Sequence, residues 1–127
     1  MIGHWYELVI DCTHPSDLAD FYQELLGMVR LEDTPDWITI RAGDHPPSIA
    51  FQKIQELRPP RWPDPEQPQQ MHIDVMVDDL DVAEPQVLAL GATLLDGSDK
   101  PIGFRVYADP AGHPFCLVTP ESVAAPD

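Results

Sequence analysis

Apolar and polar residues alternate along residues 70–79 of the chain. Alternation with a period of two is typical of a strand that packs one of its faces on a core. The apolar face is predicted to carry Ile73, Val75 and Val77, and the polar face His72, Asp74 and Met76. An imidazole and a carboxylate therefore project to the same side of this strand, which makes it a candidate part of a functional site.

The same pattern occurs earlier, along residues 6–12, where Glu7, Val9 and Asp11 share one face of a predicted strand. A helix is predicted next, with Pro15 or Ser16 near its first position and Gly27 at its end. Its apolar positions have the spacing of an amphipathic helix and are Leu18, Phe21, Tyr22, Leu25 and Leu26.

After residues 72–79 the order of elements repeats. A second helix is predicted, with Asp81 and Glu84 as a capping box and Pro85 in the first turn. Its apolar positions are Val82, Val87, Leu88 and Leu90, and Gly91 ends it. Each helix is followed by three short strand candidates, at residues 28–31, 37–41 and 48–54 and at residues 92–95, 103–108 and 114–118. The chain is therefore a tandem duplication of a βαβββ module.

Residues 1–127 are predicted to form a single α+β domain, with one module at about 5–54 and the other at about 70–119. The proline-rich connector at about 55–69 is either a surface loop or a flap that reaches the site or a second subunit, and its sequence favours neither. Residues 120–127 are predicted to be a frayed tail. Two such modules can pair their sheets so that the polar faces line one cleft and the helices cover the outside.

The formal net charge of −15 limits the classes of partner. Nucleic acid and anionic membranes are not expected as partners, because both bind through cationic side chains, whereas a cationic small molecule would be attracted. The sequence has no apolar run of membrane-spanning length and no basic-then-apolar leader, so a cytoplasmic location is expected. Cys12 and Cys116 are then expected to be free thiols.

Several segments resemble the vicinal oxygen chelate superfamily, which contains glyoxalases, bleomycin-resistance proteins, fosfomycin-resistance proteins and extradiol dioxygenases. The resemblance is closest to its glyoxalase-like domain branch. It lies in residues 11–27, His72–Val75, Asp78–Leu80, Leu90–Ala92 and Asp109–Phe115. It implies a barrel-like, incurved mixed sheet with the helices outside, and it implies a homodimer that binds a small molecule.

The resemblance also implies a divalent metal, of which Zn, Ni, Fe and Mn are candidates, although some members use none. The family's metal positions fall on Glu7, His72 and Cys116 and on a fourth position that is either Ala50 or Gln52. Of the two choices for the fourth position, only Gln52 could be a ligand. Glu7 and His72 are the candidate catalytic residues. The strand parity places Asp11, Asp74 and Met76 in the substrate cleft.

Cys116 stands where the family usually has a glutamate, and this leaves the activity open between two classes. A Glu, His and Cys donor set suits zinc and lacks the two-His-one-carboxylate pattern of iron oxygenases. One hypothesis is a metal-dependent lyase, isomerase or dioxygenase. The alternative is a metal-free, non-catalytic protein that sequesters a cationic drug or metabolite. In that case His72 hydrogen-bonds Glu7 or Asp74, and Cys116 is a small buried apolar residue.

Overall fold

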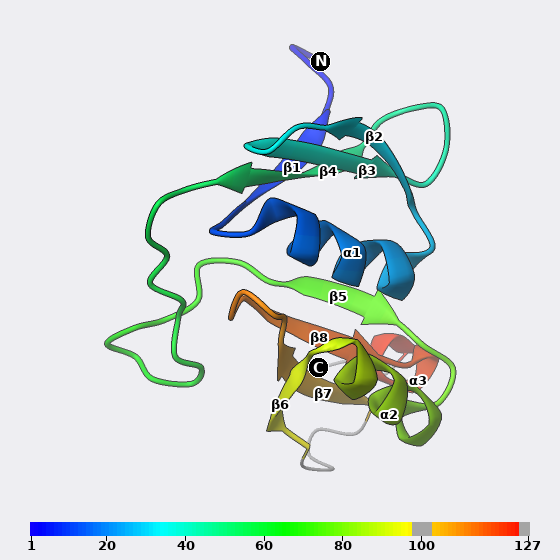
Figure 1. Ribbon diagram of the computed structural model, residues 1–127. Helices are drawn as coiled ribbons and strands as arrows, with labels where there is room; N and C mark the ends of the chain where they lie inside the picture. The colour runs from blue at the N-terminus through cyan, green and yellow to red at the C-terminus, as the bar shows by residue number, and fades with distance from the viewer. Residues whose placement is uncertain (98–102, 125–127) are drawn as a thin grey trace. The chain divides into compact units, whose positions relative to one another are not determined.

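The computed structural model describes residues 1–97 and 103–124, and the chain forms two compact units, Met1–Arg58 and Pro59–Asp127 (Figure 1). Their boundary falls inside the predicted connector. Each unit contains a strand, a helix and three further strands in that order, so the predicted tandem βαβββ duplication is confirmed. No helix in the described part of the chain is long and apolar enough to cross a membrane.

The first unit has one four-stranded mixed sheet and one helix. Its elements are β1 (Glu7–Cys12), α1 (Pro15–Leu26), β2 (Val29–Asp33), β3 (Trp37–Arg41) and β4 (Ser48–Lys53). The strand order is β1-β4-β3-β2, with β1 parallel to β4 and the other pairs antiparallel. This order places the first and last strands of the unit side by side.

The second unit repeats this arrangement. Its elements are β5 (Ile73–Met76), α2 (Leu80–Leu90), β6 (Thr93–Asp96), β7 (Phe104–Ala108), β8 (Pro114–Val118) and a short α3 (Pro120–Ala124). The strand order is β5-β8-β7-β6, with β5 parallel to β8. Both sheets are open, and neither is a closed barrel. The combination of the two into one incurved sheet stays a prediction.

The predicted frayed tail is wrong for residues 120–124, which form α3, and residues 125–127 lie outside the described residues. The buried Thr119 explains the helix start. Its carbonyl oxygen accepts from the backbone N–H of Ser122 at 3.0 Å, and its own N–H donates to the carbonyl of Gly103 at 2.8 Å. The chain is therefore fixed just before α3 by a contact with the start of β7.

Apolar packing holds α1 against the first sheet (Figure 1). Leu18, Phe21 and Tyr22 are buried on the predicted stripe, and the ring of Tyr22 stacks on that of Phe51 with centroids 5.7 Å apart. The helix begins at Pro15 as expected, and Gly27 ends it with a left-handed φ of 67°. The sequence pattern of α1 was therefore sufficient to predict both its ends and its buried face.

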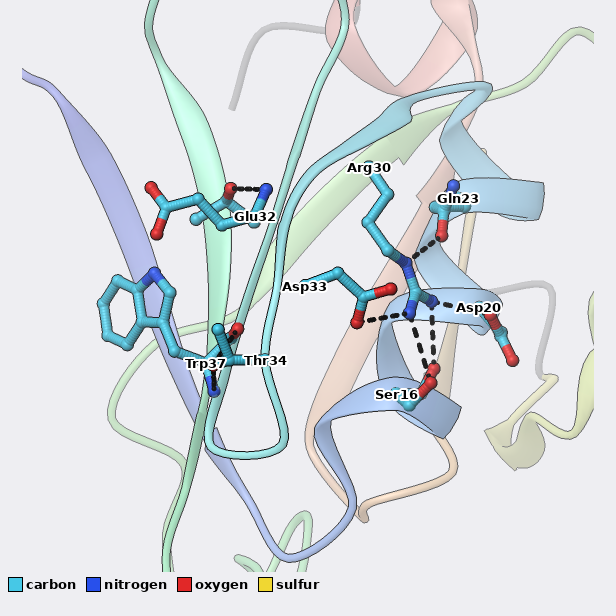
Figure 2. A network of polar contacts seen from close by, with 9 residues as sticks. Ser16, Asp20, Gln23, Arg30, Glu32, Asp33, Thr34 and Trp37 are labelled. Carbon is cyan, nitrogen blue, oxygen red and sulfur yellow. Dashed lines mark hydrogen bonds and ion pairs between the residues drawn. The ribbon is translucent and has the colours of Figure 1, made fainter.

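Arg30 of β2 adds a polar contact between the sheet and α1, as Figure 2 shows. Its guanidinium donates to the carboxylate of Asp20 at 2.7 Å, to the side-chain oxygen of Gln23 at 2.9 Å and to the hydroxyl of Ser16 at 3.2 Å. The Arg30 side chain is 17% exposed, so most of its donors are satisfied by protein rather than by water. These bonds fix the angle at which β2 leaves the helix.

The start of α2 differs from the prediction. Asp79 is the N-cap residue, and its carboxylate accepts from the backbone N–H groups of Asp81 and Val82 at 2.9 and 3.3 Å. The predicted Asp81–Glu84 capping box is therefore wrong. Pro85 also lies inside the helix, beyond its first turn, where the missing N–H removes one helical hydrogen bond.

Polar contacts connect α2 to its sheet. Arg105 of β7 contacts the carboxylates of Asp81 and Glu84 at 2.6 and 3.3 Å, and the buried Tyr107 hydroxyl donates to Glu84 at 2.8 Å. Burial and the charge of Glu84 raise the pKa of Tyr107, and the bond to Asp81 raises the pKa of Arg105. Of the predicted apolar positions of α2, only Val87 is buried.

The connector is folded into turns beside the second unit's own strands. The backbone N–H of Arg61 donates to the carbonyl of Gln67 at 2.8 Å, and that of Asp64 donates to the carbonyl of Arg61 at 2.6 Å. Pro59 lies against the β7–β8 turn, where a side chain on Gly112 would approach its Cβ to 2.6 Å. Gly112 also has a φ of 99°, so glycine is required there for two reasons.

Candidate functional site

Three of the predicted site residues come together on the polar face of the second sheet. Asp74 of β5 pairs with Cys116 of β8 in the parallel register, so both side chains project to the same side. His72 precedes β5, and its Nε2 lies 3.1 Å from a carboxylate oxygen of Asp74. The ligand atoms of the three residues all lie within 4.8 Å of one another. Asp74 is one of the two partners, Glu7 or Asp74, that the metal-free alternative gave His72.

The strand alternation explains why these side chains face away from the core. Ile73, Val75 and their β8 neighbours Phe115 and Leu117 form the opposite face, where Phe115 and Leu117 are fully buried. The predicted apolar face is therefore confirmed. His72 and Asp74 are accessible, with 38% and 56% of their side chains exposed, whereas Cys116 is buried. A ligand that approaches the polar face would reach the His72 imidazole and the Asp74 carboxylate before the Cys116 thiol.

The environment of Cys116 keeps its thiol protonated at neutral pH. Burial, and then the negative charge of Asp74 and a hydrogen bond to it, raise the pKa of Cys116 to about 11. Cys116 is thus a thiol that donates toward Asp74, and it is not an activated nucleophile. Cys12, the other cysteine, is buried in the first unit and is likewise not in a disulfide.

The chemical types of the ligand atoms indicate which metal this cluster could hold. An imidazole nitrogen, a carboxylate oxygen and a thiolate sulfur are all ligands of zinc, and the cluster brings one of each together. A hard octahedral metal would prefer an all-oxygen set, and an iron oxygenase would need two histidines and a carboxylate. The residues present therefore fit zinc. Asp74 is a candidate ligand in this set, whereas the sequence predicted only that it lies in the cleft.

Glu7, the predicted ligand or base of the first unit, lies on the polar face of the first sheet. Ser48 is its neighbour on β4, and the Ser48 hydroxyl donates to the Glu7 carboxylate at 3.0 Å. Glu7 and His72 belong to different units, so a shared set of Glu7, His72 and Cys116 stays a prediction.

The β1–β4 register places the predicted residue Gln52 beside Asp11, not beside Glu7. Gln52 is four residues from Ser48 along β4, which corresponds to roughly 13 Å. This spacing speaks against one metal held by both Gln52 and Glu7. Ala50 shares the polar face but is fully buried and has no donor atom.

The remaining predicted cleft residues have the expected parity. Asp11 is exposed at the end of β1, and Met76 pairs with Val118 and is 52% exposed. Sequence reasoning missed Ser48 and Arg41, which continue the row that starts at Glu7 across the first sheet, with Ser48 between the other two. The parity of β3 and β4 could have placed both on the polar face, but the strand pairing that brings Ser48 beside Glu7 and Arg41 beside Ser48 cannot be read from the sequence.

The tandem β-α-β-β-β units and their polar sheet faces define the vicinal oxygen chelate class of fold. The sequence model of the glyoxalase-like domain family matches residues 7–118, and the chain belongs to this family. A comparison with curated proteins gives no match.

Solved structures of several relatives share the fold at low sequence identity. One is a glyoxalase/bleomycin resistance protein/dioxygenase family enzyme from Burkholderia phytofirmans, with 18% identity, a TM-score of 0.71 and coverage of 92% of this chain and 98% of that one. A fosfomycin resistance protein from Listeria monocytogenes has 14% identity and a TM-score of 0.70, with 94% of each chain covered.

A third relative is the bleomycin-binding protein of Streptomyces verticillus, solved with copper(II)-bleomycin. It has 15% identity and a TM-score of 0.57, and the match covers 94% of this chain and 98% of that one. At these identities the likeness establishes the fold, and the ligand of this chain has to be argued from its own residues.

Proposed function

We propose that this protein binds a small molecule on the polar face of its second sheet and that His72, Asp74 and Cys116 hold a zinc-type divalent metal there. The observation that carries the proposal is the placement of three different ligand atoms within 4.8 Å on one accessible sheet face. A metal in this position would polarise an oxygen atom of the bound molecule. The contact between Nε2 of His72 and Asp74 must give way when both residues become ligands, and the buried Cys116 must release its proton.

Metal titration tests this proposal. Zinc added to the purified protein should bind at one equivalent, and binding should strengthen as the pH rises because the Cys116 thiol loses a proton on ligation. Calorimetry in two buffers of different ionisation enthalpy would count that proton. Cys116→Ser should weaken zinc binding at least tenfold, and Asp74→Asn should also weaken it.

Cys12→Ser is the matched control, since Cys12 is also a buried cysteine outside any disulfide and lies in the other unit. It should leave zinc binding unchanged. Failure of the wild-type protein to bind zinc at micromolar concentration would overturn the metal proposal, as would a Cys116→Ser protein with wild-type affinity.

Enzymatic activity of the lyase or isomerase kind would need a base in addition to the metal, and Glu7 is our candidate for it. Its carboxylate accepts from Ser48 and stands on the polar face of the first sheet. For any substrate that the wild-type protein converts, Glu7→Gln should then abolish turnover while leaving zinc binding intact. The donor set of His72, Asp74 and Cys116 argues against iron dioxygenase chemistry.

The second candidate is metal-free sequestration of a cationic compound, which the net charge of −15 and the exposed carboxylates of Asp11 and Asp74 favour. A cationic ligand should bind more weakly as salt is added and should be indifferent to a chelator. Metal-dependent binding would be lost with chelator and would change little with salt, so the pair of measurements separates the two candidates.

The predicted homodimer and cytoplasmic location remain expectations. Sedimentation of the purified protein tests the homodimer.

A further inference from the structure

A row of three polar side chains crosses the first sheet at one end of β1. Ser48 lies in the middle and is 2% exposed; its hydroxyl donates to Glu7 at 3.0 Å and accepts from Nη2 of Arg41 at 3.4 Å. The register of β1 with β4 and of β4 with β3 places all three side chains on the face opposite the buried Ile38, Ile40 and Phe51. The row therefore presents a carboxylate, a hydroxyl and a guanidinium on the polar face.

The guanidinium of Arg41 is poorly satisfied by the protein. Its Nη2 bond to Ser48 and its Nη1 bond to the carbonyl of Asp44 are 3.4 and 3.5 Å long, at the outer limit of hydrogen bonding. Its Nε is shielded from solvent and has no acceptor among the described residues. Arg41 also has no ion-pair partner in the described part of the chain, although the sequence contains 22 acidic residues.

Two other half-buried arginines show what a structural role looks like in this chain. Arg30 reaches a carboxylate at 2.7 Å and Arg105 reaches one at 2.6 Å, each with further partners (Figure 2 shows those of Arg30). Arg41 instead lies over the ring of Tyr6, with its guanidinium carbon 6.0 Å from the ring centroid. The aromatic ring supports the cation without using any of its N–H donors.

We propose that Arg41 is the anion-binding residue of a subsite on the polar face of the first sheet, and that this subsite takes the carboxylate group of a small molecule. A guanidinium binds a planar oxyanion through paired N–H donors, which is the bonding that Arg41 lacks. Glu7 is on the same row and repels a dianion more than a monoanion, so a carboxylate is favoured over a phosphate. This inference does not require the metal cluster, which lies in the second unit.

Titration with two simple anions tests the subsite. Sodium acetate and sodium phosphate are the probes, sodium chloride at equal ionic strength is the reference, and the Nε–H resonance of Arg41 is followed by NMR. Acetate should shift this resonance saturably and should bind more tightly than phosphate. The chain's charge of −15 disfavours diffuse anion binding, so a saturable shift indicates a specific site.

Substitutions then assign the effect. Arg41→Gln should weaken acetate binding at least tenfold, and Arg41→Lys should weaken it less. Because both variants lack the Nε–H group, binding to them is measured from the NMR shifts of neighbouring backbone amides. Arg61→Gln should have no effect; it removes the same charge from an exposed connector residue. Glu7→Gln should strengthen phosphate binding more than acetate binding.

No saturable shift with either probe would overturn the proposal, as would wild-type acetate affinity in Arg41→Gln. Tighter binding of phosphate than of acetate would overturn the carboxylate assignment. Zinc binding by the second unit is measured separately on the same Arg41→Gln protein and should be unchanged, so a failure of this proposal is distinguishable from a failure of the metal site.

Discussion

The two units follow the same order of elements but attach their helices by different forces. In the first unit α1 buries Leu18, Ala19, Phe21 and Tyr22 against the sheet, and Arg30 adds a polar contact at its edge. In the second unit α2 buries only Val87, and Arg105 and Tyr107 hold it through Asp81 and Glu84. A duplicated supersecondary unit therefore preserves its topology while the interactions that fix its helix are exchanged.

The difference has a consequence for stability. Apolar burial does not depend on charge screening or on protonation. Charged contacts with an exposed partner such as Asp81, at 85% side-chain exposure, are weakened by added salt and by acid that protonates the carboxylate. We therefore expect α1 to be the more persistent helix and α2 to open locally at lower cost. The His72, Asp74 and Cys116 cluster lies in the unit with the less firmly held helix.

The largest effect is expected from the core of the first unit. Phe51→Ala removes a fully buried ring that stacks on Tyr22 and should cost about 3–5 kcal/mol of unfolding free energy in urea titrations. The matched control is Val82→Ala on α2, where the side chain is 59% exposed and the cost should stay below about 0.5 kcal/mol. Equal costs would contradict the difference in burial between the Phe51 side chain, which packs on α1, and the Val82 side chain of α2.

Arg105→Met should have the next largest effect, about 1.5–3 kcal/mol, because it removes charged hydrogen bonds and leaves Glu84 and Tyr107 with fewer partners. Hydrogen exchange should show that the amides of α2 lose protection. Arg30→Met breaks a comparable set of bonds, yet the amides of α1 should stay protected because apolar packing remains. Loss of α1 protection in Arg30→Met would show that its packing is not sufficient.

The helix starts offer a smaller contrast. Asp79→Ala removes the side-chain cap of α2 and should cost about 1 kcal/mol. His14 occupies the same position before α1 but makes no side-chain cap bond, so His14→Ala should leave the denaturation midpoint unchanged. A loss in His14→Ala as large as that in Asp79→Ala would contradict the assignment of these caps.

The smallest effect at neutral pH is expected from the titration of the Cys116 thiol, which changes stability only at alkaline pH. Since its folded pKa of about 11 lies above the ordinary value of 9.0, the folded protein holds this proton more tightly, and the linked stability is lost as the pH rises between those values. Alkylation by iodoacetamide should therefore be slow at pH 8 and increase toward pH 11. Asp74→Asn removes a charge that raises this pKa and should shift the profile to lower pH. A profile centred near pH 8.5 in the wild type would refute the assignment.

Strand alternation predicted the polar and apolar faces around His72 and Asp74 because the period of two is a local property of the sequence. The same method failed for the start of α2, where Asp79 and Asp81 are both good cap residues. Only the backbone conformation decides that Asp79 is the cap, while Asp81 is recruited by Arg105, which is 24 residues away. The apolar spacing of Val82, Leu88 and Leu90 likewise predicted burial, yet these side chains are exposed.

The sequence by itself determined the repeat, the faces of the strands and the family, since each follows from short-range pattern or from motifs in order. The tertiary structure decided which strands are neighbours and in what register, and therefore that Cys116 lies beside Asp74 and Arg41 beside Ser48. These pairings join residues far apart in the chain, and no local preference specifies them. They are fixed by the packing of whole sheets, because a shift of one residue would turn every polar side chain of the strand toward the core.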